Sequence, residues 1–212
     1  MHKVTTIIFL SCIFLLGSIK ISSQNPDIDL LQSINHTPSG FLRRYSKFIS
    51  NTTTEVGAAA PVILGVVGYF KKDDEMFKNA IYTGVALAFD VAVTYGIKSA
   101  VNRPRPYITY PDLIDPQELL SSKSFPSGHT SYAFTAATAI SLKYPRWYII
   151  APSYLWACSV GYSRMNLGVH YPSDVAAGAL LGIGSAYITS KVNDWFWKKQ
   201  NNKKLIGLQA YR

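Results

Sequence analysis

Apolar residues are gathered into long runs that make up about half of the chain after residue 55. The runs are Val56–Phe70, Ala80–Ile97, Ser131–Leu142, Trp147–Tyr162 and Val175–Thr189. A helix on the surface of a soluble protein needs a polar face, whereas these runs are apolar or small on every side. Asp90 is the only formally charged side chain within them, and Gly178 and Gly182 have the spacing that lets membrane helices approach closely. We therefore predict membrane-embedded helices, although each run is shorter than the roughly 20 residues of a complete bilayer span.

The first 23 residues have the pattern of a targeting segment. His2 and Lys3 precede an apolar run from Ile7 to Ile19, and the small residues Ser22 and Ser23 follow. A short basic region, an apolar core of this length and small residues near a cut site predict a secretory signal peptide. An uncleaved first membrane helix is the alternative, so the predicted bundle contains five or six apolar helices.

Between residues 24 and 55 the pattern becomes amphipathic. Leu30, Leu31 and Ile34 recur at spacings of three and four, and a similar apolar stripe runs from Phe41 to Ile49. This periodicity predicts helices that lie along a surface. Together with the apolar runs, it predicts an all-α fold that is a polytopic membrane bundle.

The formal net charge is +9, and its distribution predicts the orientation of the bundle. If the N-terminal segment points outward, the loops at 71–79 and 143–146 and the tail at 193–212 are cytoplasmic. These segments are rich in Lys and Arg, as the positive-inside rule requires. Residues 98–129 and 163–174 then lie together on the outer face. The basic residues form no continuous stripe, which excludes a nucleic-acid-binding face.

Three cations stand at the outer ends of the apolar runs. Lys98 and Arg105 follow the second run in the pattern Lys-x6-Arg-Pro, and Arg164 follows the fourth. A phosphoryl group in transfer spreads negative charge over three oxygens, and a cage of fixed cations stabilises that charge. Each residue alone is equally consistent with an ordinary interfacial cation. Together they predict a phosphate-binding cage.

A Pro-Ser-Gly-His sequence opens the third run. The first turn of a helix exposes unpaired N–H groups, and a glycine such as Gly128 lets the backbone approach an anion. Ser127 is placed to cap the helix or to donate to the phosphate. His129, at the mouth of the helix, is placed to protonate a leaving oxygen.

His170 and Asp174 stand four residues apart, with Pro172 between them. Proline is tolerated in the first turn of a helix, so we expect a helix to begin near Pro172 with His170 just outside it. A carboxylate bonded to one imidazole nitrogen fixes the tautomer and frees the other nitrogen to attack phosphorus. By itself this spacing is common and is a weak signal of an oriented nucleophile, and Ser163 and Arg164 upstream strengthen it.

These motifs closely resemble the three-part signature of the type 2 phosphatidic acid phosphatase superfamily. That group contains membrane lipid phosphatases, class A bacterial acid phosphatases and vanadium haloperoxidases. The resemblance covers residues 98–174 and includes every signature position. The matching residues are Lys98, Arg105, Pro106, Pro126, Ser127, Gly128, His129, Ser163, Arg164, His170 and Asp174.

The resemblance implies a helical bundle and a two-step hydrolysis. His170 would attack phosphorus to give a phosphohistidine, Asp174 would orient it, and His129 would protonate the leaving group. The phosphate would be held by five further signature residues, Lys98, Arg105, Ser127, Gly128 and Arg164. The resemblance implies no metal and no cofactor.

We accordingly predict a metal-independent lipid phosphatase in the bacterial inner membrane, with its site facing the periplasm. The domain organisation is then a signal peptide or first helix (1–23), a periplasmic amphipathic segment (24–55), the phosphatase domain (56–192) and a basic cytoplasmic tail (193–212). Its partners are the bilayer and a substrate that is a phospholipid, lipid A or a polyprenyl phosphate or diphosphate. No obligate protein partner is expected.

Other interpretations stay open at this stage. The first is a soluble periplasmic acid phosphatase of the class A type, and the second is a non-catalytic phospholipid-binding membrane protein. Arg103 is either an extra contact for the phosphate or an interfacial anchor, and the second interpretation is favoured. Asp90 is either functional or a structural hydrogen-bonding group, and His36 is expected to lie exposed in a loop. The loop from Tyr107 to Ser124, with Lys123, is expected to border the headgroup.

Overall fold

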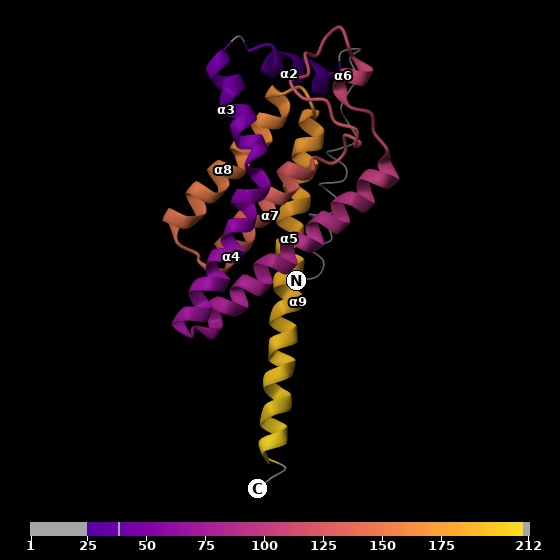
Figure 1. Ribbon diagram of the computed structural model, residues 1–212. Helices are drawn as coiled ribbons and strands as arrows, with labels where there is room; N and C mark the ends of the chain where they lie inside the picture. The colour runs from indigo at the N-terminus through magenta and orange to yellow at the C-terminus, as the bar shows by residue number, and fades with distance from the viewer. Residues whose placement is uncertain (1–24, 38, 210–212) are drawn as a thin grey trace, which may run out of the picture.

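The structure of the chain is a computed structural model that describes residues 25–37 and 39–209, with side chains described as far as residue 199. The predicted signal peptide or first helix at 1–23 lies outside the described residues. Within them every regular element is a helix, and none is a strand (Figure 1). The helices are α2 (Pro26–Asn35), α3 (Gly40–Asn51), α4 (Thr53–Lys71), α5 (Asp74–Val101), α6 (Pro106–Thr109), α7 (Gly128–Lys143), α8 (Trp147–Asn166) and α9 (Pro172–Gln209).

The apolar runs form the long helices of the bundle. Among the described residues, three stretches are long and apolar enough to cross a membrane: α4, the segment Asp74–Thr109 that contains α5, and Pro172–Lys199 in α9. The other two predicted runs form α7 and α8. The all-helical membrane fold is confirmed, whereas the number of five or six membrane helices stays a prediction. Helices α2 and α3 occupy the amphipathic stretch that precedes the bundle.

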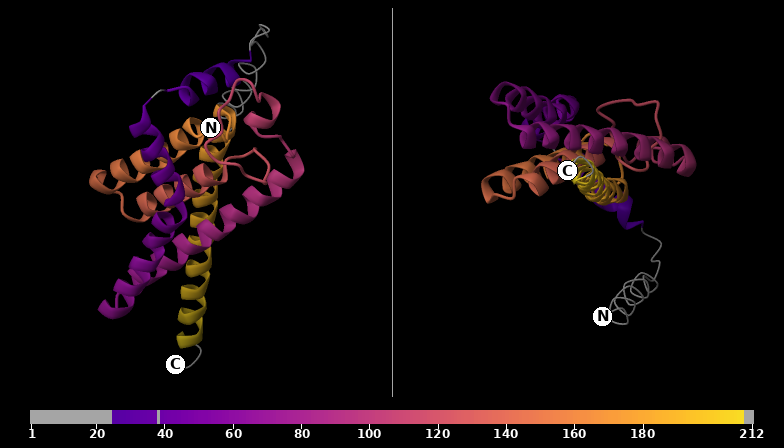
Figure 2. Two further views of the ribbon diagram at one scale, coloured as in Figure 1. Left: turned by 45° about the horizontal axis from the view of Figure 1, so that its top comes forward. Right: turned by 90° about the horizontal axis from the view of Figure 1, so that it is seen from below.

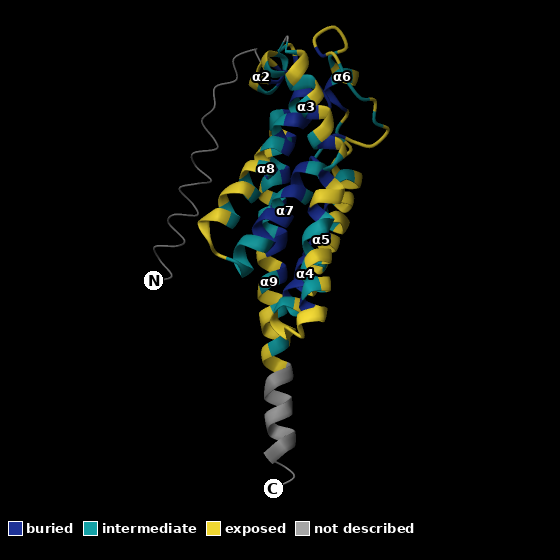
Figure 3. Ribbon diagram, turned by 60° about the vertical axis from the view of Figure 1, so that its left-hand side comes forward, coloured by how far each residue is buried: buried dark blue, intermediate teal, exposed yellow. Residues whose placement is uncertain are grey.

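Helix α7 lies at the centre of the bundle. It packs against α4, α5, α8 and α9, and the view from below shows α4 and α5 on one side of the bundle and α8 on the other (Figure 2). Its buried face carries small residues, among them Ala133, Ala136 and Ala137. The outer faces of α4, α5 and α9 are largely exposed, as the exposure colouring shows (Figure 3). They carry apolar side chains such as Val62 and Leu180, which are 61% and 72% exposed. Such a surface is suited to lipid rather than to water.

Close helix contact depends on the predicted glycine pair. A Cβ atom added at Gly182 would lie 2.2 Å from the carbonyl oxygen of Ser131, and one added at Gly178 would lie 2.6 Å from that of Ser127. Both contacts are far shorter than van der Waals separation, so only glycine lets α9 cross α7 at this distance. The interpretation of the spacing as a packing motif is confirmed.

Four helix ends meet at one end of the bundle, at the top of Figure 1. They are the C-terminal ends of α5 and α8 and the N-terminal ends of α7 and α9, and α2 crosses above them. Helix α9 begins at Pro172, as its sequence predicts. Helix α2 is fastened there by Asn35, a buried side chain that donates to the carbonyls of Asp115 and Asn166, both at 3.0 Å. The three sequence motifs therefore lie at the same end of the bundle, although the whole of α7 and α8 separates the second motif from the third along the chain.

Candidate active site

The third motif places a buried histidine beside a buried carboxylate. His170 Nδ1 lies 3.4 Å from Asp174 Oδ2, and His170 Nε2 lies 3.3 Å from Arg105 Nη1. A guanidinium can only donate, so Nε2 must carry the lone pair and Nδ1 the proton. This is the tautomer that a nucleophilic Nε2 requires. Burial lowers the pKa of His170 to about 3; Asp174 opposes this shift, and the charges of Arg164 and Arg105 favour it. The ring is therefore neutral at neutral pH.

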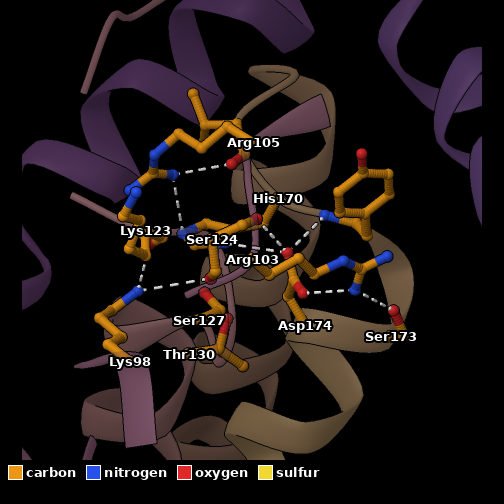
Figure 4. A network of polar contacts seen from close by, with 12 residues as sticks. Lys98, Arg103, Arg105, Lys123, Ser124, Ser127, Thr130, His170, Ser173 and Asp174 are labelled. Atoms are coloured by element: carbon orange, nitrogen blue, oxygen red, sulfur yellow. Dashed lines mark hydrogen bonds and ion pairs between the residues drawn. The ribbon is translucent and has the colours of Figure 1, made fainter. Parts of the chain in front are cut away.

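Asp174 is held by four different groups (Figure 4). Its Oδ2 atom accepts hydrogen bonds from the Ser124 hydroxyl and from the Tyr171 amide, the latter at 3.0 Å, in addition to the His170 ring. Its Oδ1 atom pairs with Arg103 Nη1 at 2.7 Å. A carboxylate bound on both oxygens has a fixed plane, so the direction of the bond to His170 is fixed as well.

Arg105 reaches the site from the segment between α5 and α6, and it is only 2% exposed. Its Nε donates to the Ser122 carbonyl at 2.8 Å, its Nη1 to the Val169 carbonyl at 2.7 Å, and its Nη2 to the Ser122 hydroxyl at 2.8 Å. These bonds hold the guanidinium next to Nε2 of His170. A phosphate oxygen placed there would meet a cation that needs no reorganisation.

Arg164, at the end of α8, is completely buried. Its Nη1 donates to the Ser50 hydroxyl and, at 3.2 Å, to Glu118 Oε2. Its Nε and Nη2 have no hydrogen-bond partner among the described residues. Buried donors are rarely left unpaired, and a guanidinium fork matches phosphate oxygens in geometry and charge. Arg164 is therefore a strong candidate for phosphate binding.

The first and second motifs complete the arrangement. Lys98 Nζ donates to the carbonyls of Lys123 and Ser124, at 2.7 and 3.3 Å, so the lysine holds the loop that carries the Ser124 hydroxyl (Figure 4). Ser127 precedes α7 but does not cap it with its side chain, because its hydroxyl bonds to that of Thr130 at 2.9 Å. The Ser127 amide donates to the Asp174 carbonyl at 3.0 Å. This bond joins the second motif to the third.

His129 stands in the first turn of α7, before the apolar run of that helix. Burial lowers its pKa to about 3, and the charges of Arg164, Arg105 and Lys98 act in the same direction. All three cations of the predicted cage therefore lower the pKa of the same histidine. A phosphate dianion bound among them would offset their charge and raise the pKa of His129 again. The arrangement suits a group that becomes an acid only when substrate is present.

A cavity of about 350 Å³ lies next to Lys98 and His129, with walls formed by α4, α5 and α7. Lys98, Ser122, Gly128 and His129 line one part of it. The rest of the wall comes from the membrane helices, namely Thr53, Thr54, Asp90, Val91, Thr94, Tyr95 and Tyr132. Arg105, Arg164 and His170 are buried beside the cavity and do not line it.

The structure corrects one interpretation and extends others. Arg103 is not an interfacial anchor, because it pairs with Asp174 inside the site. Asp90 accepts hydrogen bonds from Ser131 of α7 at 2.5 Å and from Ser185 of α9 at 3.2 Å, so it joins three helices. His36 is exposed at the end of α2, as expected.

Sequence reasoning missed Ser122, Ser124, Ser50 and Glu118, which hold the cations and the carboxylate of the site. None of them belongs to the three motifs, and hydroxyl and carboxylate residues are common in loops. Glu118, Ser122 and Ser124 lie within the loop that was expected to border the headgroup, and Ser50 does not. No local signal distinguishes these residues from their neighbours.

A profile of the PAP2 superfamily matches residues 79–198, which contain every predicted site residue. The chain belongs to the PAP2 superfamily. This is the family that the motifs resemble, so the resemblance is confirmed. The family contains phosphatases, and the apolar helices make this member a membrane protein.

Relatives with sequence similarity include lipid phosphatases. The undecaprenyl-diphosphatase of Sulfolobus acidocaldarius is 33% identical over 125 residues, which are 55% of this chain and 58% of that enzyme. The bacitracin transport permease protein BcrC of Bacillus licheniformis is 40% identical over 157 residues, which are 66% of this chain and 74% of that protein. The chain thus spans less than two thirds of the first of these relatives.

Solved structures show the same fold. The crystal structure of Aquifex aeolicus LpxE superposes with a TM-score of 0.66 at 29% identity, over 82% of this chain and 99% of that one. The transmembrane PAP2-type phosphatidylglycerolphosphate phosphatase of Bacillus subtilis superposes with a TM-score of 0.68, over 92% of this chain and 97% of that one. Its identity is 21%, so it supports the fold alone.

Proposed function

We propose that this chain hydrolyses a lipid-linked phosphomonoester or diphosphate through a phosphohistidine intermediate. One observation carries the proposal: the cavity beside Lys98 and His129 continues between apolar helices of the bundle. A phosphate bound among the cations would thus be attached to a chain that lies in the membrane. A water-soluble phosphate ester needs no such passage.

The substrate class follows from this geometry and from the relatives. One is named for undecaprenyl diphosphate, and another, from Porphyromonas gingivalis, is named as a lipid A 1-phosphatase; the two substrates differ in headgroup and share a phosphate on a lipid. Polyprenyl diphosphate, phosphatidate, phosphatidylglycerol phosphate and a lipid A phosphate are therefore the candidates. The cage recognises the phosphate that they have in common.

In the first step of the proposed reaction, Nε2 of neutral His170 attacks phosphorus. The bond between phosphorus and the leaving oxygen breaks, and His129 gives its proton to that oxygen. Asp174 keeps the Nδ1 proton in place and stabilises the positive ring that forms. The three cations Lys98, Arg105 and Arg164, with the first amides of α7 at Ser127 and Gly128, balance the charge that grows on the phosphoryl oxygens.

In the second step a water molecule attacks the phosphohistidine. His129, now neutral, accepts a proton from that water as the new bond forms, and the bond between phosphorus and Nε2 breaks. Inorganic phosphate leaves, and His170 returns to its neutral state. The two histidines thus finish as they began, and the residues of the chain account for every proton transferred.

The proposed orientation places this site at the periplasmic face of the inner membrane. The site lies at the end of the bundle where α5 finishes and α9 begins, away from the loop at 71–79 and the loop at 143–146. Those loops carry Lys71, Lys72 and Lys143, which the positive-inside rule assigns to the cytoplasm. Labelling of single cysteines in intact cells tests this assignment.

Phosphate release by the detergent-purified protein tests the activity. The assay contains EDTA and a panel of polyprenyl diphosphate, phosphatidate, phosphatidylglycerol phosphate, lipid A and p-nitrophenyl phosphate. His170→Ala removes the nucleophile, and His36→Ala is the matched control because His36 is exposed at the end of α2. We expect release by the wild type and the control, strongest on one lipid, and none by His170→Ala.

Each alternative gives a different pattern in the same assay. Release from p-nitrophenyl phosphate alone supports a non-specific acid phosphatase. Silence on every substrate, with phospholipid still bound, supports a non-catalytic binding protein. Activity that EDTA abolishes and Mg²⁺ or Zn²⁺ restores contradicts the metal-independent mechanism.

A further inference from the structure

Helix α2 lies across the end of the bundle and reaches the active site from outside the region that matches the family. It carries two acidic residues in its first turn, Asp27 and Asp29. Asp29 is exposed and its side chain makes no hydrogen bond among the described residues. Asp27 is half-buried and points toward the start of α9, so the two carboxylates have different surroundings.

Asp27 holds the first turn of α9. Its Oδ1 accepts a hydrogen bond from the Ser173 amide at 2.8 Å, and its Oδ2 accepts one from the Ser173 hydroxyl at 2.5 Å. The amide is one of the orphan donors at a helix N-terminus, and a carboxylate there is stabilised by the helix dipole. Asp27, a residue of α2, thus caps α9 at Ser173, the residue that directly precedes Asp174.

Arg103 connects the same carboxylate to the site. Its Nη2 pairs with Asp27 Oδ2 at 2.9 Å, and its Nη1 pairs with Asp174 Oδ1 at 2.7 Å (the Arg103–Asp174 contact is drawn in Figure 4). Its guanidinium carbon lies 3.7 Å from the centre of the Tyr171 ring. Nη1 also donates to the Ser173 hydroxyl at 2.8 Å. The Arg103 guanidinium is therefore fixed by ion pairs at both Nη1 and Nη2 and by the Tyr171 ring against one face.

We infer that Asp27 is a positioning residue for the reaction, acting through Arg103 on Asp174 and so on His170. This inference rests on the proposed phosphatase activity. Asp27 orients one arm of the Arg103 fork, and the other arm fixes the Asp174 plane. The same carboxylate sets the position of the α9 terminus from which Asp174 projects. An amphipathic helix that sequence reasoning assigned to a surface thus belongs to the active site.

A purely structural role for α2 is already served by other contacts. Its apolar residues Ile28 and Leu31 pack against Ile114 and Tyr171, and Asn35 fastens its C-terminal end. Packing and fastening do not require a carboxylate at position 27. The contacts of Asp27 are with Ser173 and Arg103, both beside Asp174.

Asp27→Asn tests the inference, with Asp29→Asn as the matched control that removes the same charge from the same turn. Turnover and the inhibition constant of orthophosphate are measured on the best substrate, below the unfolding temperature of each variant. We expect kcat to fall about 10-fold in Asp27→Asn, as is typical when a group that orients a catalytic residue is lost. The inhibition constant should not change, because Asp27 touches none of the cage residues Lys98, Arg105 and Arg164. Asp29→Asn should match the wild type.

A double-mutant cycle separates positioning from general stability. If Asp27 acts through Arg103, then Asp27→Asn lowers kcat much less in an Arg103→Gln background than in the wild type, because residues in one network do not act additively. Asp27→Glu should restore part of the lost turnover, since it keeps the carboxylate.

The two proposals fail in different ways. Equal kcat in Asp27→Asn and Asp29→Asn, or independent effects of Asp27 and Arg103, overturns the positioning role while the phosphatase activity stands. A parallel loss of phosphate affinity also contradicts it, since that result shows a distorted cage. Absence of turnover in the wild type rejects the proposed function itself.

Discussion

Replacement of Gly182 by alanine tests whether the contact between α7 and α9 sets the active-site geometry. Gly182 lies where the two helices cross, and an added Cβ would be 2.2 Å from the Ser131 carbonyl oxygen and 2.9 Å from the Thr135 amide nitrogen. Both neighbours are backbone atoms, so no side-chain rotation can relieve the overlap. The helices must separate if the chain is to accept a methyl group.

The size of the separation follows from those distances. An ordinary contact of a Cβ atom begins at 3.4 Å, so the Ser131 carbonyl must retreat by about 1 Å. Overpacking of this kind costs about 1–3 kcal/mol of unfolding free energy. Ser131 is one turn from Ser127, whose amide bonds to Asp174 at 3.0 Å. The shift therefore moves His129 relative to His170, and a misplacement of about 1 Å in catalytic groups costs roughly 100-fold in rate.

Gly184→Ala is the matched control, because it lies on the same helix and no atom lies within 4 Å of its added Cβ. Alanine there removes a helix-interior glycine, which stabilises a helix by roughly 0.5–1 kcal/mol. Phosphate release and thermal unfolding in detergent are measured for both variants. We expect Gly182→Ala to lose most of its turnover and some stability, and Gly184→Ala to keep both. Equal activity of the two variants refutes the claim that this crossing positions the site.

Four further predictions test individual groups. His129→Ala should spare substrates with good leaving groups relative to poor ones, measured with substituted phenyl phosphates; an equal loss contradicts the acid role. Arg164→Ala should lower kcat/KM by a factor on the order of 10² to 10³, as the loss of one preorganised donor does, and a change below about tenfold would remove Arg164 from the cage. Glu118→Gln should lower the inhibition constant of orthophosphate by about threefold, the scale of a partly exposed ion pair, because it removes a carboxylate 3.2 Å from Arg164. Finally, the pKa of His170 is lowered from 6.5 to about 3. Below pH 6.5 the unfolded chain therefore binds a proton that the folded chain does not, and stability falls as the pH falls. His170→Gln should flatten this loss of melting temperature between pH 7 and 4.5, and an unchanged slope speaks against the shift.

The site residues were predictable because their chemistry contrasts with the surrounding sequence. Cations and histidines at the ends of apolar runs are conspicuous, and the order of the runs placed all of them on one side of the membrane. Gly178 and Gly182 were likewise visible as a spacing. The structure brings the ends of these helices together at one end of the bundle, and the catalytic and binding roles of the residues stay predictions.

Arg103 and Asp27 were not predictable in the same way. Arg103 stands two residues before Arg105, and the sequence does not show which arginine faces the carboxylate and which faces the attacking nitrogen. Asp27 is 146 residues from Ser173, its partner, and periodicity assigns it only to the polar side of a helix. Long-range pairing of this kind depends on where α2 crosses the bundle, which no local pattern specifies.

The buried arginines of the site are stable only if hydrogen bonds pair their N–H donors. A guanidinium removed from water is costly unless its donors are paired. Arg105 meets this requirement with carbonyl and hydroxyl oxygens of the chain, whereas Nε and Nη2 of Arg164 have no partner among the described residues. The chain thus fixes one cation completely and leaves donors of the other for a ligand. Phosphate oxygens bound to Nε and Nη2 would complete the hydrogen bonds of Arg164. These bonds would remove the cost of two unpaired buried donors, and they would stabilise the charge on the phosphoryl group in the transition state.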